Sequence, residues 1–187
     1  MILGYGDIFN PKEIQLENGK NLSLIPDIVC ITTNGVVKTD GCAVMGAGCA
    51  KQANEIFKGI DSLLGQHIKN NGNKFRILFK TTFEYYLAAF PTKPSTVCCN
   101  KDCSNVVKHL RFKYKFGDII PGWAAISDIN LILYSCDQLM KYMNLNNLTH
   151  AVLPRPGCDN GGLDWEMVKS KINHILDERV IVVNKER

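Results

Sequence analysis

The sequence ITTNGVVKTDGCAVMGAGCAKQAN, residues 31–54, decides the fold. The apolar run of residues 28–31 leads into it and predicts a buried strand, and a glycine-rich turn follows. Ala50 to Ala53 then begin a helical pattern, with Ile56 and Phe57 as its apolar positions. Glycine lets the backbone approach an anion, and a helix N-terminus offers free N–H groups and a favourable dipole. We therefore expect this corner to hold a nucleotide diphosphate.

A second corner of the same kind lies near the C-terminus. A short strand over residues 151–153 runs into the glycine-rich loop of residues 154–162, and a helix face begins at Trp165. Between the two corners, the apolar run of residues 85–90 predicts a strand buried on both faces. The turn PTKP, residues 91–94, should end that strand rigidly. Because open α/β sheets bind ligands at the carboxyl ends of their strands, we expect these segments to share one pocket.

The rest of the chain alternates strand and helix patterns, which predicts an α/β sandwich around a mainly parallel sheet. Further strands are expected over residues 3–9, 22–25, 27–33, 75–79 and 180–183. Helical spacing runs through residues 50–68, 126–143 and 165–176. The 187 residues predict a single domain, 1–187, with an irregular insertion at about residues 95–124.

Composition and charge exclude several classes of protein. The sequence has no apolar run of about 18 residues and no signal-like N-terminus, so we expect no membrane contact and a cytoplasmic protein, in a bacterium or a phage-infected host. Most of the eight cysteines stand singly in apolar or glycine-rich segments, which indicates reduced thiols. A net charge of +4 permits a nucleic-acid partner without requiring one. We expect a monomer that needs no cofactor and no metal.

The insertion contains two patterns with alternative interpretations. Cys98, Cys99 and Cys103, with His109 downstream, could form a zinc knuckle, but the irregular spacing favours a surface cluster without metal. The stretch KHLRFKYKF, residues 108–116, alternates basic and apolar residues. It could bind nucleic acid through its four basic residues, Lys108, Arg111, Lys113 and Lys115. An edge strand with a solvated face explains the same alternation and is favoured. Trp123 and Trp165 are expected to be core or helix-packing residues.

Four separated motifs together resemble a known family. They are GDI at residues 6–8, TNG…GCAVMGAGCA at residues 33–50, FPTK at residues 90–93 and PRPGCDNGGLDW at residues 154–165. In this order they resemble a macro domain, in the branch of the DarG-type DNA ADP-ribosyl glycohydrolase antitoxins and the terminal ADP-ribose protein glycohydrolases. Phage-borne macro domains are similar over the insertion and the second loop. The resemblance implies a three-layer α/β/α sandwich with a mixed sheet, and ADP-ribose as the ligand.

The resemblance also implies where ADP-ribose would bind. Asp7 would accept a hydrogen bond from the adenine amino group beside Ile8, and Asn34 would face the distal ribose. The first loop would offer backbone N–H groups from Met45, Gly46, Ala47 and Gly48. The second loop would surround the phosphates with Pro156, Gly157, Cys158, Asn160, Gly161 and Gly162.

Lys93, in FPTK, is the strongest catalytic candidate. Similar DNA glycohydrolases require the lysine of this motif, and a lysine of lowered pKa can attack C1″ of a ribose. A lysine that only pairs with phosphate is the alternative. The family's assisting aspartate falls on Gly161 here, so Asp159 is the proposed substitute, with Asp164 assigned to a helix N-terminus.

Three functions follow from the resemblance. The first is a hydrolase that removes ADP-ribose from a DNA base or a protein side chain by cleaving the bond at C1″. The second is a phosphatase acting on ADP-ribose 1″-phosphate, and the third is a reader that binds ADP-ribose without turnover. Lys93 favours the first over the third, and nothing in the sequence separates the first two. A phage origin would imply reversal of a host ADP-ribosylation defence.

Overall fold

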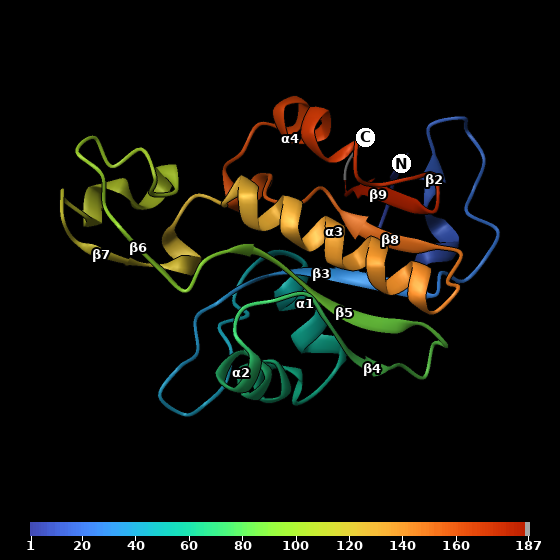
Figure 1. Ribbon diagram of the computed structural model, residues 1–187, viewed down its shortest axis with the longest axis horizontal. Helices are drawn as coiled ribbons and strands as arrows, with labels where there is room; N and C mark the ends of the chain where they lie inside the picture. Colours follow the sequence, from blue (N-terminus) through green and yellow to red (C-terminus); the bar gives the residue numbers. More distant parts are fainter. Residues whose placement is uncertain (186–187) are drawn as a thin grey trace.

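The fold, a computed structural model describing residues 1–185, is built on a seven-stranded sheet of order β2-β1-β9-β8-β3-β5-β4 (Figure 1). The strands are β1 (Ile2–Tyr5), β2 (Gln15–Leu16), β3 (Ile28–Asn34), β4 (Arg76–Lys80), β5 (Tyr86–Lys93), β8 (Ala151–Pro154) and β9 (Val180–Asn184). The five inner strands run parallel, and the edge strands β2 and β4 pair antiparallel. The expectation of a mixed, mainly parallel sheet is confirmed.

Helices cover both faces of this sheet, as Figure 1 shows. α1 (Gly48–Ile56) and α2 (Ile60–Asn71) share one buried cluster with β3, whereas α3 (Ile129–Leu145) and α4 (Trp165–Ile172) pack in a second cluster on the other face. Inner strands buried on both faces explain the continuous apolar runs in the sequence. The molecule is therefore the expected three-layer α/β/α sandwich.

The carboxyl ends of the inner strands meet at one edge, where the candidate site lies. β3 pairs with β5 from Ile28 opposite Tyr86 to Asn34 opposite Lys93. The expected break of β5 after Phe90 is wrong, because the strand continues through Pro91 and Thr92 to Lys93. Beyond Ala89 the strand β4 no longer pairs with β5, so β5 pairs only with β3 there. A proline, which lacks an N–H group, is tolerated because one edge of the strand has no strand neighbour at that point.

Several other boundaries differ from expectation. The single helix expected over residues 50–68 is divided into α1 and α2 at Gly59, which has a left-handed φ of 83°. Helix α3 begins at Ile129 because the Asp128 carboxylate accepts hydrogen bonds from the first-turn N–H groups, so Ile126 precedes the helix. The N-terminal strand ends at Tyr5, residues 22–25 form no strand, and α4 ends at Ile172.

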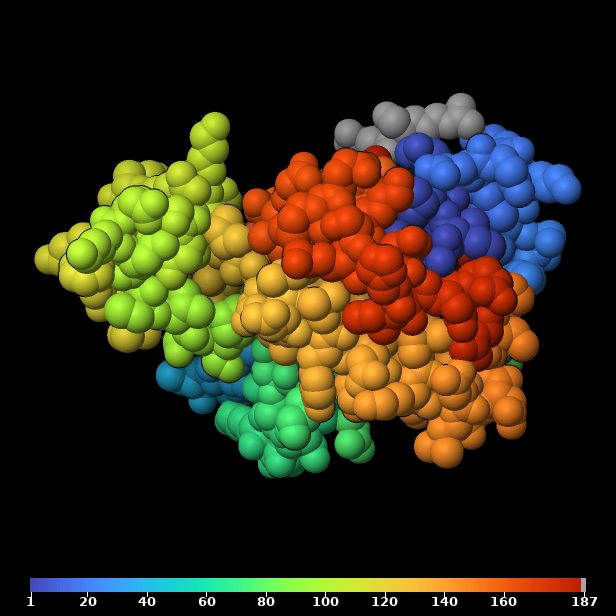
Figure 2. Space-filling model, turned by 45° about the horizontal axis from the view of Figure 1, so that its top comes forward, coloured from blue at the N-terminus to red at the C-terminus, as the bar shows by residue number. Residues whose placement is uncertain are grey.

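The insertion forms a small lobe that projects from the sandwich (Figures 1 and 2). It contains β6 (Thr96–Cys98) paired with β7 (Ile119–Pro121), and the 3-10 helices η2 (Lys108–Lys113) and η3 (Gly122–Ala124). Its own buried cluster consists of Cys99, Val106, Ile120, Ala124 and Ala125. The favoured edge strand over residues 108–116 is wrong, because most of that stretch is η2 and the turn after it.

The structure bears on the expectations about the cysteines, a metal and a membrane span. All eight cysteines are free thiols. The Sγ atoms of Cys99 and Cys103 lie 3.1 Å apart, whereas the Cys98 thiol faces the Cys99 carbonyl. Within residues 1–185, metal-ligating side chains form no group of three or more. No helix in that range is both long enough and apolar enough to cross a bilayer.

Candidate functional site

A cavity of about 850 Å³ opens at the carboxyl ends of β3, β5 and β8. This volume lies within the range of small-molecule sites. Its wall contains most of the residues expected from the sequence: Asp7, Ile8, Asn34, Met45, Gly46, Ala47, Gly48, Lys93, Gly157, Cys158, Asp159, Asn160 and Gly161. Pro156 and Gly162 lie outside the wall; Gly162 follows η4 (Asp159–Gly161) with a left-handed φ of 74°.

Asp7 marks one end of the cavity. Its carboxylate accepts a hydrogen bond from the Phe9 backbone N–H at 2.9 Å and another from the side-chain amide of Gln52 in α1. Each carboxylate oxygen can accept a further bond, so Asp7 remains able to bind a donor on a ligand. Gln52 also lines the cavity, and sequence reasoning missed it because its partner lies 45 residues away.

The first loop is held by Asn34 at the end of β3. The Asn34 side chain donates to the Val44 carbonyl and accepts from the Val36 backbone N–H, both at 2.9 Å. These two bonds fix the loop against the strand that carries it. Helix α1 begins at Gly48 without a side-chain cap and without an acidic residue in its first turn. Neither a capping side chain nor a carboxylate therefore competes with an anion for this helix N-terminus, as the sequence indicates.

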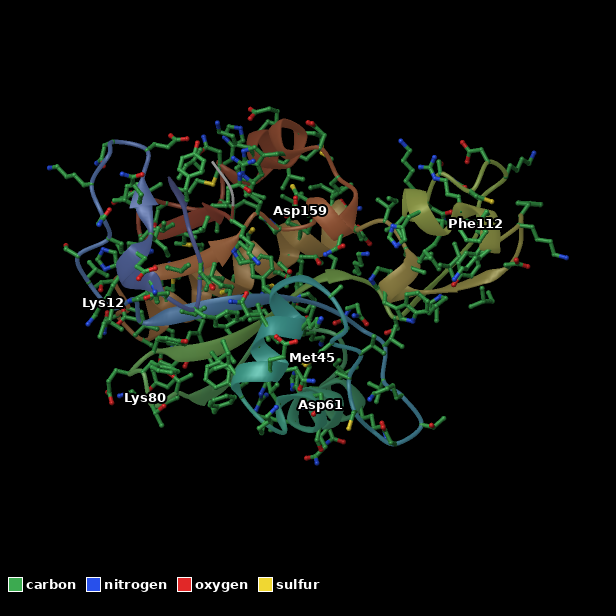
Figure 3. The ribbon with its side chains drawn as sticks, turned by 180° about the vertical axis from the view of Figure 1, so that it is seen from behind. Lys12, Met45, Asp61, Lys80, Phe112 and Asp159 are labelled. Atoms are coloured by element: carbon green, nitrogen blue, oxygen red, sulfur yellow. The ribbon has the colours of Figure 1, made fainter. Side chains whose placement is uncertain are left out.

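The second loop faces the first across the cavity. A Cβ atom placed on Gly48 would lie 3.4 Å from Nδ2 of Asn160, so the two loops approach closely at these residues. Figure 3 labels one residue from each loop, Met45 and Asp159. Gly157 has a φ of 77°, and an added Cβ there would lie 2.5 Å from Cδ1 of Ile132. The loop thus requires glycine at this position for both its conformation and its packing.

Lys93 lies at the end of β5 and is 8% exposed. Burial lowers the pKa of its ammonium group to about 8. Nζ donates to the carbonyl of Asn160 at 2.8 Å and to that of Trp123 at 3.2 Å. A neutral amine has two N–H groups and one lone pair. The two carbonyls can therefore occupy both N–H groups and leave the lone pair for reaction.

The other catalytic candidates differ from Lys93 in their surroundings. Asp159 is exposed in η4, and among residues 1–185 no hydrogen bond or ion pair joins its carboxylate to Lys93. Burial raises the pKa of the Cys158 thiol to about 12, and it also raises that of Cys49. Both thiols therefore stay protonated near neutral pH, which disfavours a cysteine nucleophile. By contrast, the pKa of Lys93 in the cavity wall is lowered toward neutral pH, which increases the fraction of reactive neutral amine.

The insertion completes the wall near Lys93. It contributes His109, Leu110 and Trp123, of which Trp123 is 42% exposed and therefore not the core residue that we expected. Trp165 packs against the second core cluster, and the Arg155 guanidinium lies 4.7 Å from the centre of its ring. Thr33 and Ser127 add two buried hydroxyl groups to the wall. The sequence contains no local signal for these contacts, because separate segments bring them together.

Comparison with known proteins supports the fold. No family model matches the sequence, and no curated protein matches it. Among solved structures, the macrodomain of Mycobacterium tuberculosis DarG is 20% identical with a TM-score of 0.61, and the match covers 98% of each chain. The macrodomain of Thermus aquaticus DarG is 19% identical with a TM-score of 0.61, covering 99% of this chain and 97% of that one.

A third similar structure is Thermosipho africanus DarTG in complex with ADP-ribose. It is 16% identical with a TM-score of 0.61, and the match covers 84% of this chain and 38% of that longer one. At these identities the similarity establishes architecture, and activity has to be argued from the site itself. The chain has the macrodomain fold.

Proposed function

We propose that the protein binds ADP-ribose and releases it from a modified macromolecule by hydrolysing the bond at C1″ of the distal ribose. The cavity is lined by Asp7 after β1, by the two glycine-rich loops after β3 and β8, and by Lys93 at the end of β5; in the sheet, β8 and β3 lie between β1 and β5. This order matches the adenine, diphosphate and distal ribose of the ligand. The fold shared with Thermosipho africanus DarTG, which was solved with ADP-ribose, supports the same ligand.

The state of Lys93 is the observation that carries this proposal. A pKa of about 8 leaves a useful fraction of neutral amine at physiological pH, and two carbonyls orient the group. Attack of the amine on C1″ would form a carbon–nitrogen bond and break the bond to the macromolecule, whose leaving atom takes up the proton that the attacking amine loses. Water would then add its hydroxyl at C1″ and its proton to the lysine nitrogen, which breaks the carbon–nitrogen bond, releases ADP-ribose and restores the free amine. One water is consumed per turnover.

The loops would stabilise the charge of the diphosphate during these steps. The uncapped first turn of α1 directs backbone N–H groups at the cavity from one side. Such donors are fixed before the ligand arrives, so they need no reorganisation during reaction. Gly46 has no atom within 4 Å of an added Cβ, which leaves open space for a diphosphate beside the loop.

The lobe supports a nucleic acid as the carrier of the ADP-ribose. Phe112 and Phe116 are 81% and 64% exposed, and the basic residues Lys108, Lys113 and Lys115 lie beside them in the sequence on the exposed surface. Figure 3 shows Phe112 on the projecting lobe. Exposed aromatic rings and lysines are the groups that stack on bases and neutralise phosphates of a single strand. Arg111 contributes less, because its guanidinium binds the Val106 and Ser104 carbonyls.

A panel of substrates tests the proposal. Purified protein is incubated with ADP-ribosylated single-stranded DNA, ADP-ribosylated protein and ADP-ribose 1″-phosphate, and release is measured for wild type and Lys93→Ala. We expect Lys93-dependent release from a macromolecule, and from DNA in preference to protein. Release of phosphate alone would favour the phosphatase. Tight ADP-ribose binding without any release would favour the reader, and no binding of ADP-ribose would overturn the proposal.

A further inference from the structure

Cys99 and Cys103, in the lobe, are two free thiols in direct contact. Their Sγ atoms lie 3.1 Å apart, and the Cys103 thiol also faces the Tyr114 carbonyl at 3.5 Å. Two thiolates on a tetrahedral zinc ion would lie about 3.8 Å apart, because each Zn–S bond is about 2.3 Å long. A disulfide bond is about 2.05 Å long, so an approach of about 1 Å would join the two sulfurs. The spacing therefore fits a disulfide better than a shared metal.

The backbone that carries the two thiols is fixed by hydrogen bonds. The Cys99 N–H donates to the Asp118 carbonyl at 2.8 Å, and the Cys99 carbonyl accepts from the Gly117 N–H at 3.0 Å. The Cys103 N–H closes a turn on the Asn100 carbonyl at 3.1 Å, with a left-handed φ of 53° at Cys103. A residue other than glycine seldom adopts this φ, so its surroundings impose it. The proximity of the two thiols thus rests on a fixed turn.

The two thiols differ in their access to an oxidant. Cys99 is fully buried in the lobe's own cluster, and burial raises the pKa of its thiol to about 11. Cys103 is partly exposed. Oxidation of a thiol requires exposure and the thiolate form, both of which are denied to Cys99 near neutral pH. An oxidant should therefore react first at Cys103, with Cys99 as the second thiol that resolves the product.

We propose that Cys99 and Cys103 are a redox-active pair, which a peroxide oxidises to a reversible disulfide that staples the lobe. The Cys103 sulfur would attack one oxygen of hydrogen peroxide, which yields a sulfenic acid and one water. The Cys99 sulfur would then attack the sulfenic sulfur, so that the S–S bond forms as the S–O bond breaks. The departing hydroxide takes up the Cys99 proton and leaves as a second water. Two electrons pass from the thiols to the peroxide, and a thiol reductant reverses the change.

The lobe is a part of the molecule that a staple would strengthen. Its buried cluster is small, and short chain segments with small cores are commonly stabilised by disulfides. Directly after Cys103, residues 105–107 pair with residues 124–126 through hydrogen bonds of 2.8 and 2.9 Å. These pairs flank Trp123, whose carbonyl accepts from Lys93 Nζ. Because the sulfurs need so small an approach, the disulfide should restrict unfolding of the lobe without breaking its contact with Lys93.

Peptide mapping tests the inference, because the exposed Lys101 lies between the two cysteines. Folded protein is treated with hydrogen peroxide, blocked with iodoacetamide, denatured and digested with trypsin. The peptides on either side of Lys101 should stay joined, about 2 Da lighter than their sum because two hydrogens are lost, and should separate in dithiothreitol. Cys98→Ser is the matched control and should give the same link, since the Cys98 thiol faces the Cys99 carbonyl.

A second variant tests the order of the two steps. Cys99→Ala, made in the Cys98→Ser protein, removes the resolving thiol. The sulfenic acid at Cys103 should then persist and be trapped by dimedone, at least about tenfold more than in Cys98→Ser alone. Free Cys99 and Cys103 after a peroxide dose that oxidises the exposed Cys98 would overturn the inference, as would a link from Cys98 to either of them.

Limited trypsin digestion of the folded protein measures the staple. Cleavage within residues 108–115 should be at least about threefold slower in oxidised than in reduced Cys98→Ser, because cleavage requires local unfolding of the lobe. The variant that also lacks Cys99 should show no such difference, which controls for other effects of peroxide. Equal rates in oxidised and reduced Cys98→Ser would overturn the stapling role. None of these measurements involves ADP-ribose, so their outcome is independent of the proposed function.

Discussion

The Nζ atom of Lys93 lies 2.8 Å from the carbonyl oxygen of Asn160, although the two residues are 67 positions apart in the chain. This contact ties the end of β5 to the second loop and places an amine of lowered pKa in the cavity wall. A lysine that served only to neutralise phosphate would gain from remaining exposed and fully charged. Its burial among backbone carbonyls instead supports the proposed nucleophilic role.

Replacement of Lys93 should separate chemistry from binding. Lys93→Ala should reduce release of ADP-ribose by roughly three orders of magnitude or more, because it removes the nucleophile. Affinity for free ADP-ribose should change by no more than about tenfold. Single-turnover release and calorimetry measure the two quantities. Lys141→Ala is the control, since Lys141 is exposed and pairs with Asp137 on α3. Equal activity of Lys93→Ala and wild type would exclude a nucleophilic role.

The rate of release should depend on pH through Lys93. Attack needs the neutral amine, and burial sets its pKa at about 8. We therefore expect kcat/KM, which reports the free enzyme, to rise with pH up to about 8 and then to level off. Lys93→Arg should be inactive at every pH, because a guanidinium stays protonated. A rate that falls as pH increases through 8 would show that the ammonium form is the active one.

The same shift links the stability of the protein to pH. The pKa of Lys93 is about 8 in the folded chain and 10.5 in an ordinary lysine, so between these values the unfolded state binds more protons. The free energy of unfolding contributed by this residue should consequently increase as pH rises from about 8 to 10.5. Denaturant unfolding of wild type and Lys93→Met, compared across this window, isolates the contribution. A difference between the two that does not vary with pH would contradict the shift.

The two loops should respond differently to substitution of their glycines. Gly157→Ala should lower the free energy of unfolding by about 2 kcal/mol, because it combines a left-handed φ with a clash against Ile132. Gly46→Val should leave stability nearly unchanged, since the space beside Gly46 is open. It should nevertheless weaken ADP-ribose binding at least about tenfold if the diphosphate occupies that space. Thermal unfolding and calorimetry measure the stability and the ADP-ribose affinity of both variants. Retained affinity in Gly46→Val would show that the diphosphate does not lie against the first loop.

Asp159→Asn tests the weakest of the assigned roles. Asp159 is exposed, has a φ of 48° and makes no hydrogen bond or ion pair with Lys93 within residues 1–185, but it lines the cavity beside Asn160. If its carboxylate moves a proton to the leaving group, turnover should fall roughly 10²-fold with little change in ADP-ribose affinity. Asparagine also tolerates a left-handed φ, so the loop should keep its conformation. Unchanged turnover would remove Asp159 from the mechanism.

The sequence by itself determined much of the fold. The continuous apolar runs of residues 28–31 and 85–90 predicted a buried strand and a strand buried on both faces, and the structure confirms them in β3 and β5. The corner at Gly48 and the loop after β8 were also readable, because strand, turn and helix patterns arise from steric preferences over a few neighbouring residues. Boundaries were less readable. Pro91 was expected to end β5, and only the missing strand neighbour beyond Ala89 explains why it does not.

Only the tertiary structure decided how the site is assembled. Strand order places Lys93 at the same sheet edge as the loop after β8, and the insertion adds the carbonyl of Trp123 from 30 residues away. The bond between Gln52 and Asp7 and the room that Gly161 leaves for Ser127 Oγ likewise join distant segments. Such contacts depend on how whole elements pack, and no local pattern encodes them. The sequence determined which residue carries the amine, whereas packing determined its burial and thus its pKa.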